Sequence, residues 1–219
     1  MVDWFCMIYP KKRNIHRPAH IYLDGEIYFV SCRTFRGKSY FRGNSKDFIV
    51  SSVRLAKEKY NFKLFAWAIL DNHYHLLLEV AKGDDLFKVV RFINGRSARL
   101  LNKLLDAPSG LLDAPSGCVI KSGTSGVYKI TKPEASSCRI AGPEASSCRR
   151  VWYQYREKIV RGEKDFYAYF NYIHHNPVKH GLIKNFGELK KYPFCSYGFW
   201  LGKMGRKWLE EVTGQSRFV

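Results

Sequence analysis

The sequence has few acidic residues and no long apolar run, and each absence excludes a class of protein. Asp and Glu number 19 against 37 Lys and Arg, which gives a formal net charge of +18. Such an excess is unusual for an enzyme of small metabolites and indicates a polyanionic partner. No apolar stretch is long enough to span a membrane, and Met1 to Tyr9 is too short and too polar for a signal peptide. We therefore expect a cytoplasmic protein that has no membrane partner.

Cysteine is present, but not in the pairs that typically bind zinc. None of the six cysteines belongs to a Cys-X-X-Cys pair, which argues against a structural zinc site. Free thiols in a reducing compartment are the simplest interpretation. Hydrophobic residues make up 46% of the chain and aromatic residues 16%, enough for a packed core and for surfaces on which bases could stack.

Residues 105–149 differ from the rest of the chain. The segment Leu104 to Gly110 is repeated at once as Leu111 to Gly117, and Pro133 to Arg139 recurs as Pro143 to Arg149. Two short copies of each cannot build the core of a repeat protein, so they predict a long, disordered and flexible insertion. Since the cost of closing a loop grows slowly with its length, we expect the chain to fold and act without residues 106–148.

Apolar periodicity predicts a mixed α+β domain around this insertion. Strands are expected at 26–34, 62–70 and 151–160, and a further strand is expected to start at His73 after a turn at Asp71-Asn72. Helices are expected at 47–60, capped by Asn44 or Ser45, at 84–104, and from Gly162 to His175, where Asn176-Pro177 ends or kinks the helix. The aromatic C-terminal region would form one or two short helices, or a tail that contacts a partner.

His73 and His75 flank one aromatic residue at the start of an apolar strand. Because side chains alternate along a strand, the two imidazoles point to the same face and could form a platform for a metal ion. The alternative is two structural histidines that are satisfied by hydrogen bonds.

Tyr172 and Asn176 are four residues apart and would share one face of a helix. With His73 and His75, the amide oxygen of Asn176 would complete three ligands for Mg²⁺ or Mn²⁺. A metal there would polarise a phosphate, and the Tyr172 hydroxyl would attack phosphorus to give a phosphotyrosine and a free 3′-hydroxyl.

Simpler interpretations of both residues remain open from the pattern alone. Asn176 could cap the helix before Pro177, and Tyr172 could be an ordinary aromatic residue of a Tyr-rich helix. Other tyrosines are equally plausible from chemistry alone, namely Tyr153, Tyr155, Tyr167 and Tyr169. The basic residues of the 84–104 helix could be a solvated face or could lie along a sugar-phosphate backbone.

Two segments resemble a known family. The run Asn72 to Leu78 is similar to the His-hydrophobic-His (HUH) strand of the IS200-like single-tyrosine transposases, and Tyr172 to Leu182 is similar to the tyrosine helix of their REP-associated branch. The resemblance implies a ferredoxin-like α+β fold, an antiparallel sheet with helices on one face. It implies Tyr172 as the nucleophile and His73, His75 and Asn176 around a divalent metal. It further implies single-stranded or hairpin DNA as the partner.

Composition and the resemblance together give the expected organisation of the chain. The residues themselves indicate a basic arm at 1–24, the insertion at 105–149, which the family usually lacks, and an aromatic and basic tail at 191–219. The resemblance implies a catalytic domain at 25–104 and 151–190. We expect a monomer or a homodimer, associated with the nucleoid when bound to DNA. The alternatives are a module that binds hairpin nucleic acid without cutting it, a decayed and inactive transposase copy, or an HUH nuclease of another kind.

Overall fold

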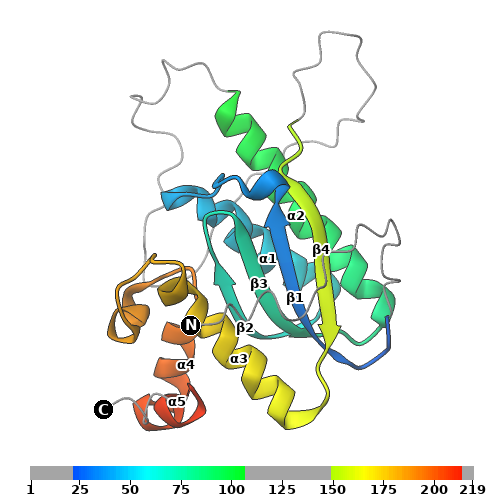
Figure 1. Ribbon diagram of the computed structural model, residues 1–219. Helices are drawn as coiled ribbons and strands as arrows, with labels where there is room; N and C mark the ends of the chain where they lie inside the picture. Colours follow the sequence, from blue (N-terminus) through cyan, green and yellow to red (C-terminus); the bar gives the residue numbers. More distant parts are fainter. Residues whose placement is uncertain (1–21, 107–148, 214–219) are drawn as a thin grey trace, which may run out of the picture.

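The computed structural model describes residues 22–106 and 149–213 (Figure 1). The N-terminal arm to residue 21 and most of the expected insertion lie outside these described residues. The described elements follow one another as β1 (Ile27–Thr34), α1 (Asp47–Tyr60), β2 (Lys63–Ile69), β3 (His73–Glu79), α2 (Gly83–Leu105), β4 (Trp152–Ile159), α3 (Gly162–Lys179), α4 (Tyr197–Met204) and α5 (Arg206–Thr213).

The described strands form one four-stranded sheet in the order β2-β3-β1-β4, with every neighbouring pair antiparallel. The order of elements from β1 to β4 is β-α-β-β-α-β, which together with this strand order is the ferredoxin-like arrangement, so the predicted fold class is confirmed. The predicted hairpin is also confirmed, because β2 and β3 are joined through a turn in which the Leu70 N–H donates to the His73 carbonyl at 2.8 Å.

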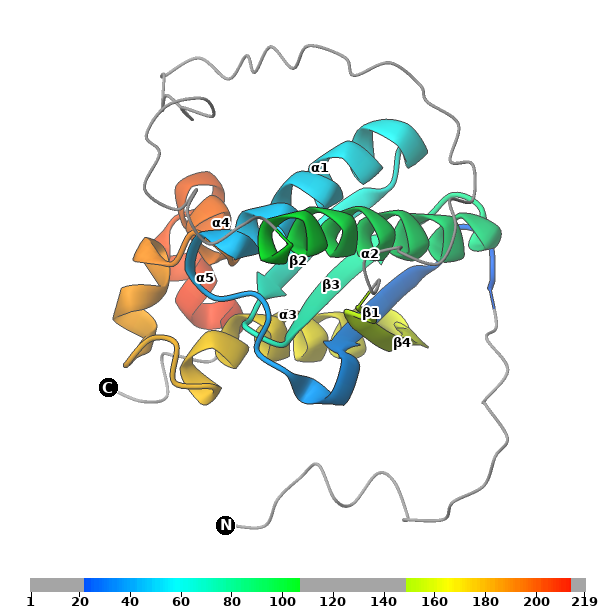
Figure 2. The same cartoon turned by 90° about the horizontal axis from the view of Figure 1, so that it is seen from above.

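Helices cover both faces of this sheet, whereas the sequence predicted helices on one face. Helices α1 and α2 lie on one side and α3 on the other (Figure 2). Along β3, Leu76 and Leu78 pack toward α1 and α2, and Leu77 packs toward α3. A strand that is apolar at consecutive positions is buried on both faces, so the run Leu76 to Leu78 already required a second covering layer.

Helix α1 begins without the predicted cap. A 3₁₀ turn at Gly43–Lys46 precedes the helix, and neither Asn44 nor Ser45 caps it. The Ser45 hydroxyl donates instead to the carbonyl of Arg42, the residue before that turn, at 2.7 Å. Asn44 and Ser45 thus indicated a helix start correctly, but the Ser45 hydroxyl forms its hydrogen bond at the preceding 3₁₀ turn and does not cap α1.

Of the two predicted outcomes at Asn176-Pro177, an end or a kink, the end is wrong, because α3 continues to Lys179. It ends where Gly181 takes a positive φ of +67°. The Gly181 N–H donates to the Val178 carbonyl and the Leu182 N–H to the Pro177 carbonyl, both at 2.9 Å. This is the Schellman closure that glycine favours, so the glycine and not the proline marks the end of the helix.

The C-terminal region packs on the sheet as two short helices, the first of the two predicted alternatives. The Trp200 indole N–H donates to the Phe65 carbonyl of β2 at 2.7 Å. The Ser196 hydroxyl lies 2.8 Å from Nε2 of the buried His174. These contacts hold α4 against β2 and α3. In the described part of the chain, no helix has the length and apolar character needed to cross a membrane.

Candidate active site

Strand β3 presents His73 and His75 on the face that α3 covers. Their ring centroids are 4.9 Å apart. His75 is buried, with 3% of its surface exposed, and His73 is half-buried. The strand's alternation therefore brings the two imidazoles together, as the sequence predicted.

Helix α3 places Tyr172 against this pair. The Tyr172 and His75 ring centroids are 5.3 Å apart, with the rings edge to face. Phe29 of β1 packs against both rings, at 5.7 Å from Tyr172 and 5.4 Å from His75. Tyr172 and His75, which are almost a hundred positions apart in the sequence, thus lie in contact, and Phe29 packs against both.

The other tyrosines that the sequence left open take different positions. Tyr169, one turn before Tyr172, stacks on Phe29 with centroids 4.5 Å apart. Tyr155 shares a hydrogen bond of 2.5 Å with the hydroxyl of Tyr22. Tyr153 packs on Phe35, and Tyr167 on Phe166. Tyr172, by comparison, has its ring against that of His75.

Asn176 lies inside α3 and is not its cap, so the capping interpretation is wrong. Its Nδ2 donates to the Tyr172 carbonyl one turn earlier at 2.5 Å. Its Oδ1 is buried and has no hydrogen-bond partner within residues 22–106 and 149–213, and the same is true of both ring nitrogens of His75. A buried polar atom without a partner costs about 1–3 kcal/mol, so three such atoms in one place indicate a missing ligand.

Burial keeps the two imidazoles neutral. It lowers the pKa of His73 to about 4, with a further contribution from the charges of His180 and Arg33. It also lowers the pKa of His75 well below its usual value, and His73 adds to that shift. Neutral imidazoles carry the lone pair that a metal ion needs, so both rings are in the form of a ligand.

Tyr172 is protonated at neutral pH. Burial raises the pKa of its phenol above the usual value, and the Asn176 side chain partly offsets that rise. The same amide opposes the fall in the pKa of both histidines. The phenol would therefore need a nearby positive charge or a base to become a nucleophile.

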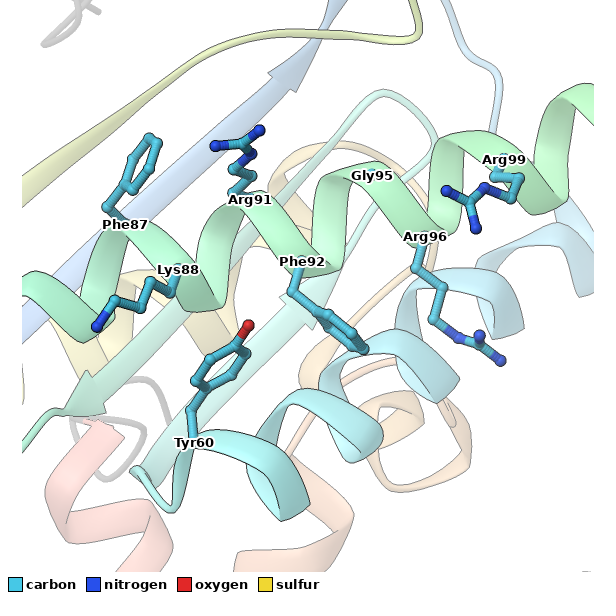
Figure 3. A pocket seen from close by; sticks show the side chains of 8 residues that line it. All are labelled: Tyr60, Phe87, Lys88, Arg91, Phe92, Gly95, Arg96 and Arg99. Atoms are coloured by element: carbon cyan, nitrogen blue, oxygen red, sulfur yellow. The ribbon is translucent and has the colours of Figure 1, made fainter. Parts of the chain in front are cut away.

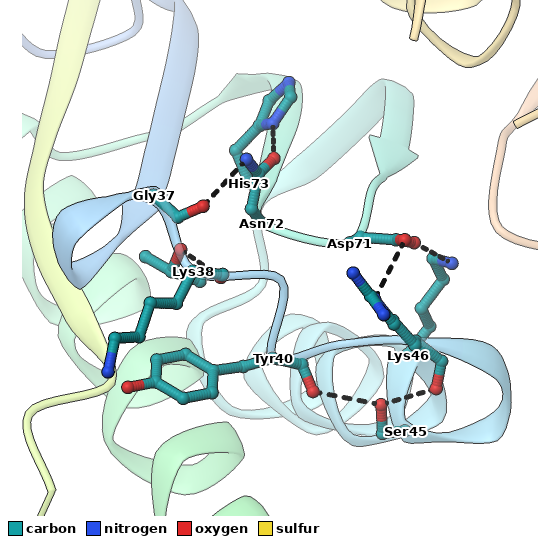
Figure 4. Close-up of polar contacts among 10 residues, drawn as sticks. Gly37, Lys38, Tyr40, Ser45, Lys46, Asp71, Asn72 and His73 are labelled. Carbon is teal, nitrogen blue, oxygen red and sulfur yellow. Dashed lines mark hydrogen bonds and ion pairs between the residues drawn. The ribbon is translucent and has the colours of Figure 1, made fainter. Parts of the chain in front are cut away.

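Asn72 orients His73, and sequence reasoning treated it only as a turn residue. Its Nδ2 donates to the Gly37 carbonyl at 3.1 Å, which turns its Oδ1 toward Nδ1 of His73 at 2.6 Å (Figure 4). The amide oxygen can only accept, so Nδ1 carries the proton and Nε2 keeps its lone pair. The sequence did carry a signal for this role of Asn72, because a residue with a hydrogen-bonding side chain directly precedes a candidate metal ligand.

The turn that carries Asn72 is itself held by backbone and ionic contacts. The Thr34 N–H donates to the Asn72 carbonyl at 2.8 Å, and the Phe41 N–H to the Asp71 carbonyl at 2.9 Å. The Asp71 carboxylate pairs with the buried Lys46 ammonium at 2.6 Å. These contacts fix the start of β3, and with it the position of His73.

His180 is a second neighbour that the sequence did not single out. Its ring lies 4.8 Å from His73, centroid to centroid, just beyond the end of α3. No group of three His, Cys, Asp or Glu side chains among the described residues has a geometry that could hold a metal ion. A divalent ion bound by His73 and His75 would therefore depend on an amide oxygen, and the unpartnered Oδ1 of Asn176 has the right chemistry.

Comparison with known proteins finds a related family. Residues 24–109, which include both histidines, match the family described as "Transposase IS200 like". The resemblance to the IS200-like transposases is confirmed. Tyr172 and Asn176 lie beyond the matched residues, so their roles depend on the geometry above.

Longer matches connect the chain to the REP-associated branch of these transposases. A Haemophilus influenzae protein provisionally named REP-associated tyrosine transposase is 25% identical over 79% of this chain and 80% of its own length. An Escherichia coli REP-associated tyrosine transposase is 21% identical over 80% and 79%. A solved REP-associated tyrosine transposase bound to a REP hairpin shares the fold, with a TM-score of 0.59, 18% identity and 88% of both chains covered.

Proposed function

We propose that this protein is a single-stranded DNA transposase that depends on a divalent metal ion and uses Tyr172 as its nucleophile. The observation that carries the proposal is the contact of Tyr172 with His75, beside three buried polar atoms that have no partner in the described part of the chain. The match to IS200-like transposases supports the reaction class. The related structure bound to a REP hairpin supports hairpin DNA as the partner.

His73, His75 and Asn176 would hold the metal, which is Mg²⁺ or Mn²⁺. Two neutral imidazoles and an amide oxygen suit either ion, and the nitrogens favour Mn²⁺. When bound, the ion would supply a positive charge that polarises the scissile phosphate and favours the ionised form of Tyr172.

The chain's own residues do the remaining work in the proposed reaction. The Tyr172 oxygen loses its proton and forms a bond to phosphorus, and the bond from phosphorus to the 3′ oxygen breaks. The departing 3′ oxygen takes up a proton and becomes a free hydroxyl, while the 5′ phosphate stays on Tyr172. Because the new ester keeps the linkage, the 3′-hydroxyl of a second strand can reverse the attack and join the DNA without a nucleotide cofactor.

The apolar contacts around Tyr172 have a part in this step. Phe29 packs on the rings of His75 and Tyr172, which limits the motion of the phenol and excludes water from one side of it. A nucleophile that is already positioned loses less entropy on the way to the transition state.

A strand labelled at its 3′ end tests the proposal. With hairpin DNA and Mn²⁺, the label should become attached to the protein and survive denaturation, and the Tyr172→Phe variant should form no such adduct. Tyr169→Phe is the matched control, because it removes a phenol hydroxyl from the same helix and keeps the ring that stacks on Phe29. An adduct that survives in Tyr172→Phe would contradict the assigned nucleophile. No adduct with any hairpin substrate would favour the binding module or the decayed copy.

A further inference from the structure

A second surface of the chain has features of a binding site and lies away from Tyr172. A cavity of about 460 Å³ lies between the end of α1 and the outer side of α2 (Figure 3). Helices α2 and α3 lie on opposite sides of the sheet (Figure 2). The sheet therefore separates this groove from the candidate active site.

The walls of the groove carry positive charge and no carboxylate. Its charged side chains are Lys88, Arg91, Arg96 and Arg99. Lys88 pairs with Asp85 at 2.8 Å, outside the wall. The Nε of Arg96 is buried and has no hydrogen-bond partner among the described residues. Most of the positive charge is thus available to an anion.

Aromatic rings stand between these charges. Phe87 is 43% exposed, and Tyr60 and Phe92 are half-buried with their rings edge to face at 6.0 Å. The guanidinium of Arg91 lies over the Phe87 ring at 5.8 Å. An exposed phenylalanine beside arginines adds little to the core, but it offers a flat surface on which a base can stack.

Gly95 leaves the middle of the groove open. It lies on α2 between Arg91 and Arg99 (Figure 3). A Cβ built at this position would meet no atom within 4 Å outside its own helix. Glycine weakens a helix interior, so this position lowers helix stability and keeps space above the helix free.

We propose that this groove binds a single-stranded segment of DNA outside the cleavage centre. Cations would contact the phosphates, and Phe87 with its aromatic neighbours would stack on the bases. Paired bases keep their faces inside a duplex, so the exposed rings favour a single strand over a duplex. That the ligand is DNA rests on the proposed function, whereas the positive charge and the aromatic rings of the groove are properties of its own residues.

Photo-crosslinking of the full chain tests this proposal. A short single strand that carries iododeoxyuridine is irradiated with the protein, and crosslinked peptides are identified by mass spectrometry. Label is expected on peptides that contain Phe87 or Phe92. The same strand annealed to its complement should label them about tenfold less, because its bases cannot stack on the rings. Equal labelling by the duplex, or no label on these peptides, overturns the proposal.

Two variants with a matched control give a second measurement. Gly95→Leu fills the groove with a better helix former, and Arg91→Glu with Arg99→Glu cancels the positive charge of its walls. Both should reduce labelling of the Phe87 peptide by about tenfold or more. Lys82→Glu with Lys103→Glu changes the net charge equally, at exposed residues outside the groove, and should retain the label. Equal loss in this control would show that net charge alone determines binding.

Failure of this proposal can be distinguished from failure of the proposed function. The crosslink to the groove needs no cleavage and should persist in Tyr172→Phe. The covalent adduct needs Tyr172, so its absence would leave the groove crosslinks unchanged. Groove peptides that lose their label in Tyr172→Phe would contradict a separate site.

Discussion

Tyr74 and His75 are neighbours on β3 that face opposite sides of the sheet, and their buried polar groups differ in hydrogen bonding. Toward α1 and α2, the buried Tyr74 hydroxyl donates to Asn94 at 2.8 Å, and Asn94 donates to the Cys32 sulfur at 3.1 Å. Toward α3, the next residue, His75, has two buried ring nitrogens without partners. The buried hydroxyl of Tyr74 is thus satisfied within the fold. The ring nitrogens of His75 have no such partner among the described residues, which costs stability and is typical of a site that binds a ligand.

The largest expected effect is on the α3 face. His73→Ala and His75→Ala should each reduce DNA cleavage by about a thousandfold, since each removes a proposed metal ligand. Removal of divalent ions with a chelator should have the same effect on the unaltered protein. A gel assay of strand cleavage measures both.

DNA binding provides the control for these histidine variants. Most of the affinity should come from the basic surface, so hairpin binding should stay within about twofold and fall steeply as salt is added. An equal loss of binding and cleavage would show that the histidines support the DNA surface or the fold.

A smaller effect is expected from Asn72, which orients His73 without being a ligand. Asn72→Ala should weaken Mn²⁺ binding by about 10- to 100-fold, the usual cost of losing an orienting partner. Calorimetry measures the affinity, and ¹⁵N NMR of the imidazoles should show that His73 no longer keeps its proton on Nδ1. Unchanged NMR signals would show that Asn72 does not set the tautomer. Asn61→Ala, at the exposed end of α1, is the control.

The smallest expected effect is on the free energy of unfolding, which should respond differently to substitutions on the two faces of the sheet. Without metal, His75→Leu should leave the free energy of unfolding unchanged or raise it by about 1 kcal/mol, because it replaces buried polar atoms that have no partners. Tyr74→Phe should lower the free energy of unfolding by about 1 kcal/mol or more, because it leaves Asn94 without its donor. Urea denaturation measures both, and a strongly destabilised His75→Leu would contradict this view of the site.

Local patterns were enough to predict much of the fold. The predicted helix at 47–60 coincides with α1, and each predicted strand matches an observed one to within about a residue or two. These segments carry their own periodicity, so their structure can be predicted without knowledge of their neighbours. Alternation along β3 also predicted correctly that His73 and His75 share a face.

Contacts between distant segments explain most of what the sequence could not show. Tyr169 and Tyr172 both lie on α3, and their different contacts, a stack on Phe29 for Tyr169 and an edge-to-face contact with His75 for Tyr172, depend on strands far away in the sequence. The role of Asn72 depends on the Gly37 carbonyl, which arrives from a loop far earlier in the chain. The continuation of α3 through Pro177 is different, because the local glycine signal at Gly181 was present and outweighed the proline.

The central claim is that Tyr172, His73, His75 and Asn176 form one reaction centre. The most direct test is mass spectrometry of the protein–DNA adduct after digestion by protease and nuclease. The residual nucleotide phosphate should be found on Tyr172 and should require Mn²⁺ or Mg²⁺. Its attachment to Tyr169 or another tyrosine, or its formation without a divalent ion, would contradict the claim.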